Sequence, residues 1–269
     1  MRRTVLPLTE KQLEELAEQE SRFFAGVSDI VEENIGIFLS IPAFPEYGSA
    51  NRALRLRDDG RGAEAVADAV CAFYWERELF PSADLDTVSE SQGIGSALRR
   101  RGLNSAVSNR LLMRYELETL PQISSPFAVQ RIPNDSGKDE AKEWLDVSLS
   151  QENDEVEAGE WRKILSGDTR ELSHQLYIAY AHDAPASCCQ LFSDNGYGRI
   201  DDVLTCPEYR GLGLASAVVA HAIDVSIRDG NHTTFLYCEA GSVAEKLYRK
   251  LGFTPWERNP FRRHFASSP

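Results

Sequence analysis

The amino-acid sequence predicts an α/β fold built on a mixed sheet, because strand patterns and helix patterns alternate in its second half. Three strand-like segments come first, at residues 176–181, 186–192 and 199–206. Asn195-Gly196 is a strong hairpin signal between the last two. An amphipathic helix pattern then covers about residues 212–229, and a segment rich in β-formers follows at 233–238. The three strands would form an antiparallel meander. A helix between two strands is a crossover that returns the chain to a parallel neighbour, so the two patterns together predict a mixed sheet.

Two further helices complete this half of the chain. One precedes the meander, with Ser136 and Asp139 as its expected cap and apolar positions at Ala141, Trp144, Leu145 and Leu149. The other follows the strand at 233–238 and opens at Ser242, with Glu245 completing a capping box. We expect this helix to end at Gly252, in the usual place for a left-handed cap.

The first half repeats the later part of this order. Strand patterns lie at 35–41, 52–57 and 83–86, helices follow Gly62 and the Ser89/Gln92 capping pattern, and the last helix ends at Gly102. The distance from Gly62 to Gly102 nearly equals that from Gly213 to Gly252. The sequence therefore indicates a diverged duplication, the alternative being a chance similarity of two α/β segments.

The best linker candidate is Leu120–Pro126, where prolines and serines interrupt the periodic patterns on both sides. A chain of 269 residues is long enough for two compact domains. We therefore expect an N-terminal domain at residues 1–124 and a second domain at 125–269.

Composition and charge exclude several function classes. The formal net charge of −13 disfavours nucleic acid and favours a cationic partner such as a free amine. No apolar stretch approaches the roughly 20 residues of a membrane helix, and the N-terminus has no signal-peptide core. The five cysteines are odd in number and, like the five histidines, lack metal-ligand spacing. We expect reduced thiols, a cytoplasmic location and no metal.

The sharpest motif is the glycine-containing segment Pro207–Ser216, which follows a strand and opens a helix. Small residues at Gly211, Gly213 and Ala215 let a ligand approach the backbone. The first amides of the new helix have no internal partner and, with the helix dipole, form an anion site beside Arg210. The alternative is a tight strand–helix turn whose glycines serve geometry only. A dinucleotide fold is not indicated, because the GxGxxG spacing is absent.

Two motifs in this half resemble those of the GNAT superfamily of acetyltransferases. Arg210, Gly213 and Ala215 match its acetyl-CoA motif, which is Arg or Gln, two residues, Gly, one residue, then Gly or Ala. The segment Ala244–Phe253 resembles the second hallmark, in the right order and spacing. The resemblance covers roughly residues 126–258 and implies the GNAT acyltransferase fold, in tandem if the duplication is real.

The resemblance also implies the cosubstrate and its contacts. Acetyl-CoA would place its pantetheine arm on the backbone of Leu204, Thr205 and Cys206. Its pyrophosphate would bind the amides of Gly211, Leu212, Gly213, Leu214, Ala215 and Ser216. Tyr248 matches the tyrosine that protonates the leaving CoA thiolate; the alternative is a half-buried aromatic. One departure is Gly241, where many members have asparagine, and we expect the nearby Ser242 to cap its helix.

The chemistry needs a general base, and the resemblance implies that it lies on the strand before the turn. Asp201 and Asp202 both lie there, and strand alternation would put them on opposite faces, so that only one faces the site. Asp201 is preferred, Asp202 is the second candidate, and a solvated carboxylate is the alternative for either.

The first half lacks such a phosphate loop. The comparable segment, Arg57–Glu64, contains Asp58 and Asp59, which would repel a pyrophosphate. We expect this half to be a degenerate, non-catalytic GNAT-like domain.

The function expected from this resemblance is an N-acetyltransferase in which the amine attacks the thioester directly. The alternative is a non-catalytic module that binds or senses acyl-CoA. A third hypothesis is an enzyme that acylates an alcohol or thiol, or that uses a longer acyl group. A small-molecule or peptide amine is the expected acceptor: antibiotic, amino acid, polyamine, peptide N-terminus and protein lysine are all compatible. The sequence carries no signal for an oligomeric state.

Overall fold

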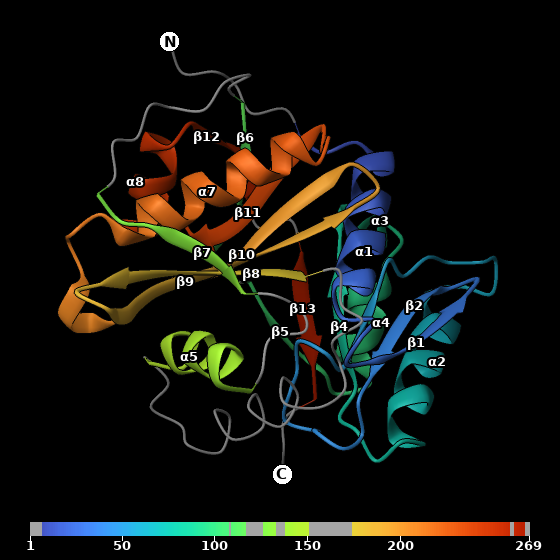
Figure 1. Cartoon of the computed structure of the whole chain (residues 1–269). Helices are drawn as coiled ribbons and strands as arrows, with labels where there is room; N and C mark the ends of the chain where they lie inside the picture. Colours follow the sequence, from blue (N-terminus) through green and yellow to red (C-terminus); the bar gives the residue numbers. More distant parts are fainter. Residues whose placement is uncertain are drawn as a thin grey trace. The chain divides into compact units, whose positions relative to one another are not determined.

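The computed structural model describes residues 7–107, 109–116, 126–132, 138–150, 174–258 and 261–266. It divides into two compact units, Met1–Arg110 with Glu257–Pro269, and Leu111–Trp256. Each unit has a mixed sheet with its own helices (Figure 1), so the predicted fold class is confirmed. Apart from Pro126, the predicted linker lies outside the described residues, and the boundary at 124/125 stays a prediction.

The second unit contains a seven-stranded sheet in the order β12-β6-β11-β10-β9-β8-β7. Its strands are β6 (Arg110–Tyr115), β7 (Val129–Ile132), β8 (His174–Ala181), β9 (Ala184–Asp194), β10 (Tyr197–Thr205), β11 (Thr233–Glu239) and β12 (Phe253–Arg258). Its helices are α5 (Lys138–Ser148), the 3-10 turn η2 (Pro207–Tyr209), α7 (Leu214–Arg228) and α8 (Val243–Lys250). β8, β9 and β10 are antiparallel and β11 is parallel to β10, which confirms the predicted meander and crossover.

Both hairpin turns of the meander place two residues in the left-handed region. At the second turn these are Asn195 (φ 46°) and Gly196 (φ 79°), as the sequence predicts. At the first they are His182 (φ 50°) and Asp183 (φ 67°), between β8 and β9. Two successive left-handed residues give a type I′ turn, whose twist matches that of the flanking strands.

Helices cover both faces of the meander (Figure 1). The apolar side of α7 packs on one face, where Val218 and Ile223 meet Leu191 and Ile200. α5 covers the other face through Trp144, whose indole Nε1 donates to the Cys189 carbonyl at 3.0 Å. The strands are therefore buried on both sides, which explains their near-continuous apolar pattern.

The N-terminus of α8 is capped by Ser242, as predicted. The Ser242 hydroxyl accepts from the Glu245 amide at 3.1 Å, so this side chain serves the helix. The Glu245 carboxylate accepts from the Gly241 amide at 2.6 Å rather than from the Ser242 amide, which extends the expected capping box by one residue.

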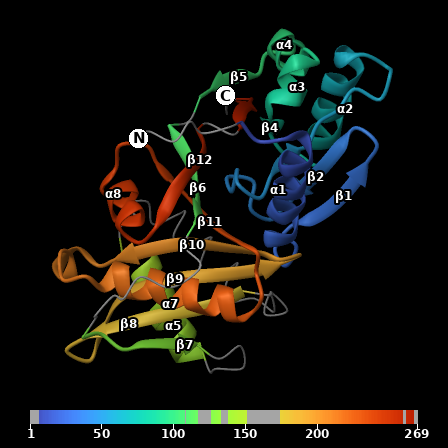
Figure 2. The same ribbon diagram turned by 90° about the horizontal axis from the view of Figure 1, so that it is seen from above.

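The first unit has a six-stranded sheet in the order β1-β2-β3-β4-β13-β5. Its strands are β1 (Asp29–Glu33), β2 (Gly36–Ser40), β3 (Arg52–Leu54), β4 (Ser82–Leu85), β5 (Asn104–Ala106) and β13 (Arg262–Phe265). Its helices are α1 (Glu10–Phe23), α2 (Ala63–Trp75), α3 (Thr87–Ser91) and α4 (Ile94–Arg100). α2 and α4 lie side by side (Figure 2), and Val66, Val70 and Leu98 are buried in this unit's core.

The two units follow one topology. In each, three antiparallel strands lead into a helix and then into a strand parallel to the third, as β3, α2 and β4 do in the first unit and β10, α7 and β11 in the second. The order predicted from the sequence repeat is therefore present in the structure.

Each sheet also takes one strand from the other half of the sequence. β6 follows β5 along the chain but lies between β11 and β12 in the second unit's sheet. β13 follows β12 but lies between β4 and β5 in the first unit's sheet, antiparallel to both. The two halves have in effect exchanged the equivalent strand, so neither half of the sequence alone contains a complete sheet.

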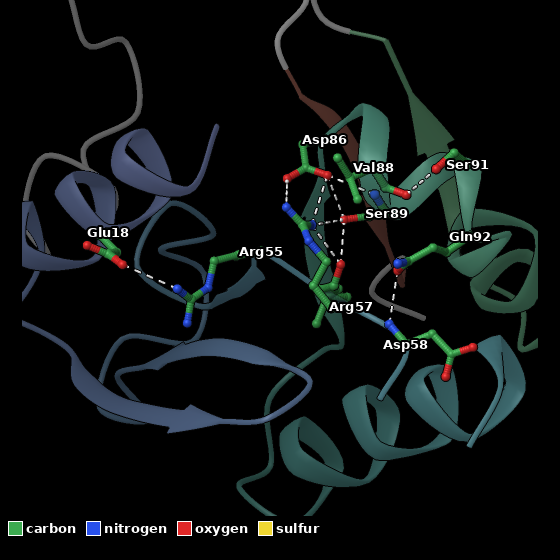
Figure 3. Close-up of polar contacts among 10 residues, drawn as sticks. Glu18, Arg55, Arg57, Asp58, Asp86, Val88, Ser89, Ser91 and Gln92 are labelled. Carbon is green, nitrogen blue, oxygen red and sulfur yellow. Dashed lines mark hydrogen bonds and ion pairs between the residues drawn. The ribbon is translucent and has the colours of Figure 1, made fainter. Parts of the chain in front are cut away.

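The predicted cap at Ser89 is wrong, because the first unit uses Asp86 instead (Figure 3). The Asp86 carboxylate accepts from the Ser89 amide at 2.8 Å and from the Arg57 guanidinium at 3.0 and 3.1 Å. The Ser89 hydroxyl donates to the Leu56 carbonyl, and Gln92 accepts from the Asp58 amide at 2.9 Å. Ser89 and Gln92 therefore tie α3 to the segment after β3.

Candidate active site

The site lies where two parallel strands of the second unit separate. β10 pairs with β11 only over Tyr197–Ile200, opposite Thr233–Leu236, while it stays paired with β9 as far as Thr205. A cavity of about 260 Å³ opens beyond the last β10–β11 pair. It is lined by Ile200, Asp201, Asp202, Val203, Leu204, Tyr237 and Tyr248.

A β-bulge shapes the wall of this cavity. The register between β10 and β9 shifts between Asp201 and Leu204, and Asp202 adopts a left-handed backbone with φ 49°. Such a conformation costs about 1–2 kcal/mol for a residue other than glycine. The bulge interrupts the alternation of side chains, so both Asp201 and Asp202 line the cavity. The expectation that only one of them faces the site is wrong for this reason.

Asp201 is tied to a cation. The Arg199 guanidinium, which is 3% exposed, donates through Nε to Asp201 Oδ2 at 2.8 Å and lies 5.6 Å from the ring centroid of Tyr237. Asp201 Oδ1 also accepts from the Asp202 amide at 3.0 Å. This carboxylate is therefore engaged by two donors that stabilise its charged form.

Asp202 has a different environment. Burial, together with the neighbouring Asp201 charge, raises the pKa of Asp202 to about 7, although Arg199 and a hydrogen bond from Gln190 act in the opposite sense. A carboxyl with a pKa near neutrality can both accept and release a proton at physiological pH. Of the two aspartates, Asp202 has the properties of a general base.

Tyr248 reaches the same cavity from α8. Its side chain is 5% exposed, and the centroid of its ring lies 6.0 Å from that of Phe253. Burial raises the pKa of Tyr248 above its ordinary value, so the phenol is protonated at neutral pH. The structure thus places a proton donor and a candidate proton acceptor on the wall of one cavity.

The predicted phosphate turn follows β10 through the short turn η2. Gly211 (φ 80°) and Gly213 (φ 93°) are left-handed and exposed, and Gly213 is the N-cap of α7. Within the described residues, no side chain caps this helix, so the amides of Leu214, Ala215 and Ser216 are bare N-terminal donors. The Arg210 guanidinium bonds back to the Thr205 carbonyl at 3.4 Å.

The backbone between cavity and turn runs along β10. Leu204 and Thr205 pair with Cys188 and Ser187 of β9, and the Cys206 amide donates to the Ala186 carbonyl at 2.9 Å. The predicted residues from Asp201 to Ser216 thus form one continuous segment of chain, and Tyr248 joins it at the cavity. Leu214 contributes only its backbone, because its side chain is buried in the core.

The equivalent turn of the first unit is occupied by its own chain. Gly60 (φ 97°) and Gly62 (φ 90°) repeat the geometry of Gly211 and Gly213. Asp58 Oδ1 accepts from the amides of both, at 2.9 and 2.8 Å. A carboxylate therefore lies where a ligand anion would bind, a more direct obstacle than the expected repulsion.

Sequence reasoning missed three residues around the two aspartates: Arg199, Gln190 and Tyr237. Arg199 is two residues from Asp201, so an alternation argument could have found it. Gln190 bonds to Asp202 from β9, and Tyr237 lines the cavity from β11. Only the strand register brings these two residues to the aspartates.

Comparison with known proteins identifies the second unit. Residues 138–253 match the acetyltransferase (GNAT) family. Residues 138–253 therefore form a GNAT-family acetyltransferase domain. The match spans α5 to the start of β12 and includes the bulge, the phosphate turn and Tyr248.

Solved structures share the fold of most of the chain at low identity. A GCN5-related N-acetyltransferase from Kribbella flavida is 14% identical over 96% of each chain, with a TM-score of 0.65. A functionally unknown conserved protein from Staphylococcus epidermidis is 12% identical over 90% of this chain and 96% of its own, with a TM-score of 0.64. A tandem GNAT protein from the clavulanic acid biosynthesis pathway is 14% identical over 81% of this chain and 75% of its own, with a TM-score of 0.58. No curated protein matches the sequence.

Other features of the chain bear on the remaining expectations. All five cysteines are free thiols. In the described part of the chain, no group of three or more His, Cys, Asp and Glu side chains is arranged to hold a metal ion. None of the described helices has both the length and the apolar character needed to cross a bilayer.

Proposed function

We propose that the protein is an N-acetyltransferase that moves the acetyl group of acetyl-CoA to a primary amine by direct attack. The observation that carries the proposal is the cavity between β10 and β11, which joins Asp202 and Tyr248 to the strand that leads into the phosphate turn. Acyl transfer follows from family membership, whereas the acetyl donor, the amine acceptor and the roles below are the proposal.

The turn and the strand supply the cosubstrate site. The pyrophosphate binds the amides from Gly211 to Ser216, where the helix dipole favours an anion. The pantetheine arm lies along β10 at Leu204–Cys206, on the side where the ladder to β11 has ended. The thioester then reaches the cavity at the bulge.

The acceptor enters as a cation beside two carboxylates. Asp202, in its charged form, takes a proton from the ammonium, directly or through water. The amine nitrogen then bonds to the thioester carbonyl carbon, and a backbone N–H of β10 polarises the carbonyl oxygen. The C–S bond breaks as Tyr248 gives its proton to the CoA sulfur. The new amide nitrogen releases its second proton to solvent, the tyrosinate regains one from solvent, and Asp202 later releases to solvent the proton that it took.

Replacement of Tyr248 by phenylalanine tests the acid role. We expect kcat to fall by about 10²-fold, because the thiolate must leave without a placed proton donor, while the Kd of CoA stays close to wild type. Turnover is measured as free CoA released in a screen of amino acids, polyamines, aminoglycosides and peptides, and the Kd by calorimetry. If every amine fails with the wild-type protein while CoA still binds, the chain is an acyl-CoA-binding module instead.

The phosphate turn is tested by copying the first unit's carboxylate into the second. Tyr209 precedes Gly211 by two residues, as Asp58 precedes Gly60, so Tyr209→Asp places an anion beside the turn amides. We expect it to weaken CoA binding about tenfold or more relative to Tyr209→Asn, which has the same size without the charge. Calorimetry on the wild-type protein should give one CoA per chain, because the Asp58 carboxylate already occupies the equivalent turn of the first unit. Equal affinities for the two variants would contradict the pyrophosphate site.

A further inference from the structure

Asp202 is one end of a chain of hydrogen bonds that crosses three strands. Gln190 Nε2, on β9, donates to Asp202 Oδ2 on β10. Gln190 Oε1 lies 2.7 Å from His174 Nδ1, on β8. Both ends of the glutamine amide are therefore engaged, one by the carboxylate and the other by the imidazole.

The two contacts determine which atoms carry protons. A carboxylate can only accept, so Gln190 must present its NH₂ group to Asp202 and its oxygen to His174. An amide oxygen can only accept as well, so His174 Nδ1 must carry a proton. Rotation of the Gln190 amide by 180° would set its oxygen against the carboxylate, and the donor from His174 opposes that rotation.

The chain is held by rigid surroundings. Gln190 is 7% exposed and pairs with Leu176 of β8 and Asp201 of β10 in the sheet. The His174 ring lies against Phe192 in a tilted arrangement, with 4.9 Å between the centroids. Neither side chain lines the cavity, so neither is placed to touch the substrate.

We propose that Gln190 and His174 are positioning residues that hold the Asp202 carboxylate in its proton-accepting orientation. The inference rests on the proposed function for its catalytic meaning, but its geometry does not depend on turnover. Gln190 stabilises the charged form of Asp202, and His174 acts one step further out by keeping the amide in the donating orientation.

Other charged or titratable groups also face Asp202 and must stay constant in any test. They are Asp201 and Arg199 on its own strand, Cys188 and Cys189 on β9, Tyr237 on β11 and Tyr248 on α8. Variants at Gln190 and His174 leave all of these side chains in place.

The test is an NMR titration of the full chain labelled with [γ-¹³C]aspartate, in which Asp202→Asn assigns the Asp202 signal. We expect Gln190→Leu to raise the Asp202 midpoint by about one pH unit or more, because the carboxylate loses its donor. His174→Phe keeps a ring against Phe192 but frees the amide to rotate, so we expect a smaller shift in the same direction. His174→Asn, whose NH₂ can donate in place of Nδ1, should restore the wild-type midpoint.

The outcomes separate this proposal from the proposed function. The positioning proposal would be overturned if the Asp202 midpoint were unchanged in both Gln190→Leu and His174→Phe. It would also be overturned if His174→Phe shifted the midpoint and His174→Asn did not return it to the wild-type value. If Gln190→Leu does not fold, the His174 pair decides the matter alone. Correct shifts in a protein that turns over no amine would leave the positioning intact and refute the acetyltransferase.

Discussion

Replacement of Asp202 by asparagine should lower kcat/KM by about 10³-fold with the best acceptor from the amine screen, because general-base catalysis typically contributes 10²–10⁴. The variant should also lose the acid limb of the pH profile. In the wild type that limb should lie near pH 7, where the Asp202 carboxyl ionises. Below this pH the carboxyl is protonated and cannot accept the ammonium proton, so activity rises with pH through 7 and falls again only when the free amine replaces the ammonium. Stopped assays of CoA release from pH 5 to 10 measure both limbs.

Asp201→Asn is the matched control, since the two aspartates are neighbours in the same cavity. Asp201 raises the pKa of Asp202, and its removal also leaves the Arg199 charge without its partner. Both changes favour the Asp202 carboxylate, so the acid limb should move to lower pH while most of kcat is retained. A large loss of kcat in Asp201→Asn, with near wild-type turnover in Asp202→Asn, would make Asp201 the base, as the sequence alone favoured.

The choice between the two aspartates shows where pattern reasoning stopped working. The sequence predicted the meander, the crossover helix α7, the turn at Gly211–Gly213 and the helix with Tyr248, because each depends on local periodicity or on residues with special backbone freedom. The choice between Asp201 and Asp202 depended on alternation, which holds only in a regular strand. No local signal marks Asp202 as a residue that will accept a left-handed backbone.

Long-range strand pairing was the other feature that the sequence did not predict. The contacts of Gln190 with His174 and Asp202 depend on the register of β8, β9 and β10. The exchange of β6 and β13 between the two sheets is also invisible in composition, since either strand fits a pleated, half-buried position. In the first unit the cap went to Asp86 rather than Ser89, because Asp86 also neutralises Arg57.

The exchanged strand β13 is fixed in the first unit by a buried charge network. Arg263 of β13 donates twice to Asp84 of β4, at 2.7 and 2.8 Å, and Arg52 of β3 lies 3.0 Å from the same carboxylate. Arg52 is 2% exposed and also binds Glu20 of α1. Four elements therefore depend on one guanidinium in the middle of the network.

The pKa of Asp84 measures how tightly this network holds. Burial alone would raise it, but Arg52 and Arg263 hold the pKa of Asp84 at about 2, below the 3.8 of an ordinary aspartate. A depressed carboxyl pKa stabilises the fold above pH 4, by about 2 kcal/mol, and this contribution is lost as the pH falls from 4 towards 2.

Arg52→Met should therefore destabilise the first unit by about 3–5 kcal/mol, because it leaves Glu20 and Asp84 buried without their shared cation. The pKa of Asp84 should rise, so acid unfolding of this unit should begin at a higher pH than in the wild type. The matched control is Arg100→Met on α4, where the lost partner, Glu64, is 52% exposed and can be solvated by water. Urea unfolding of the full chain, followed by hydrogen exchange at β4 and β13, measures the stability of the first unit in both variants. Equal urea midpoints for Arg52→Met and Arg100→Met would mean that the buried carboxylates do not need Arg52. The backbone ladder alone would then hold β13 in its sheet.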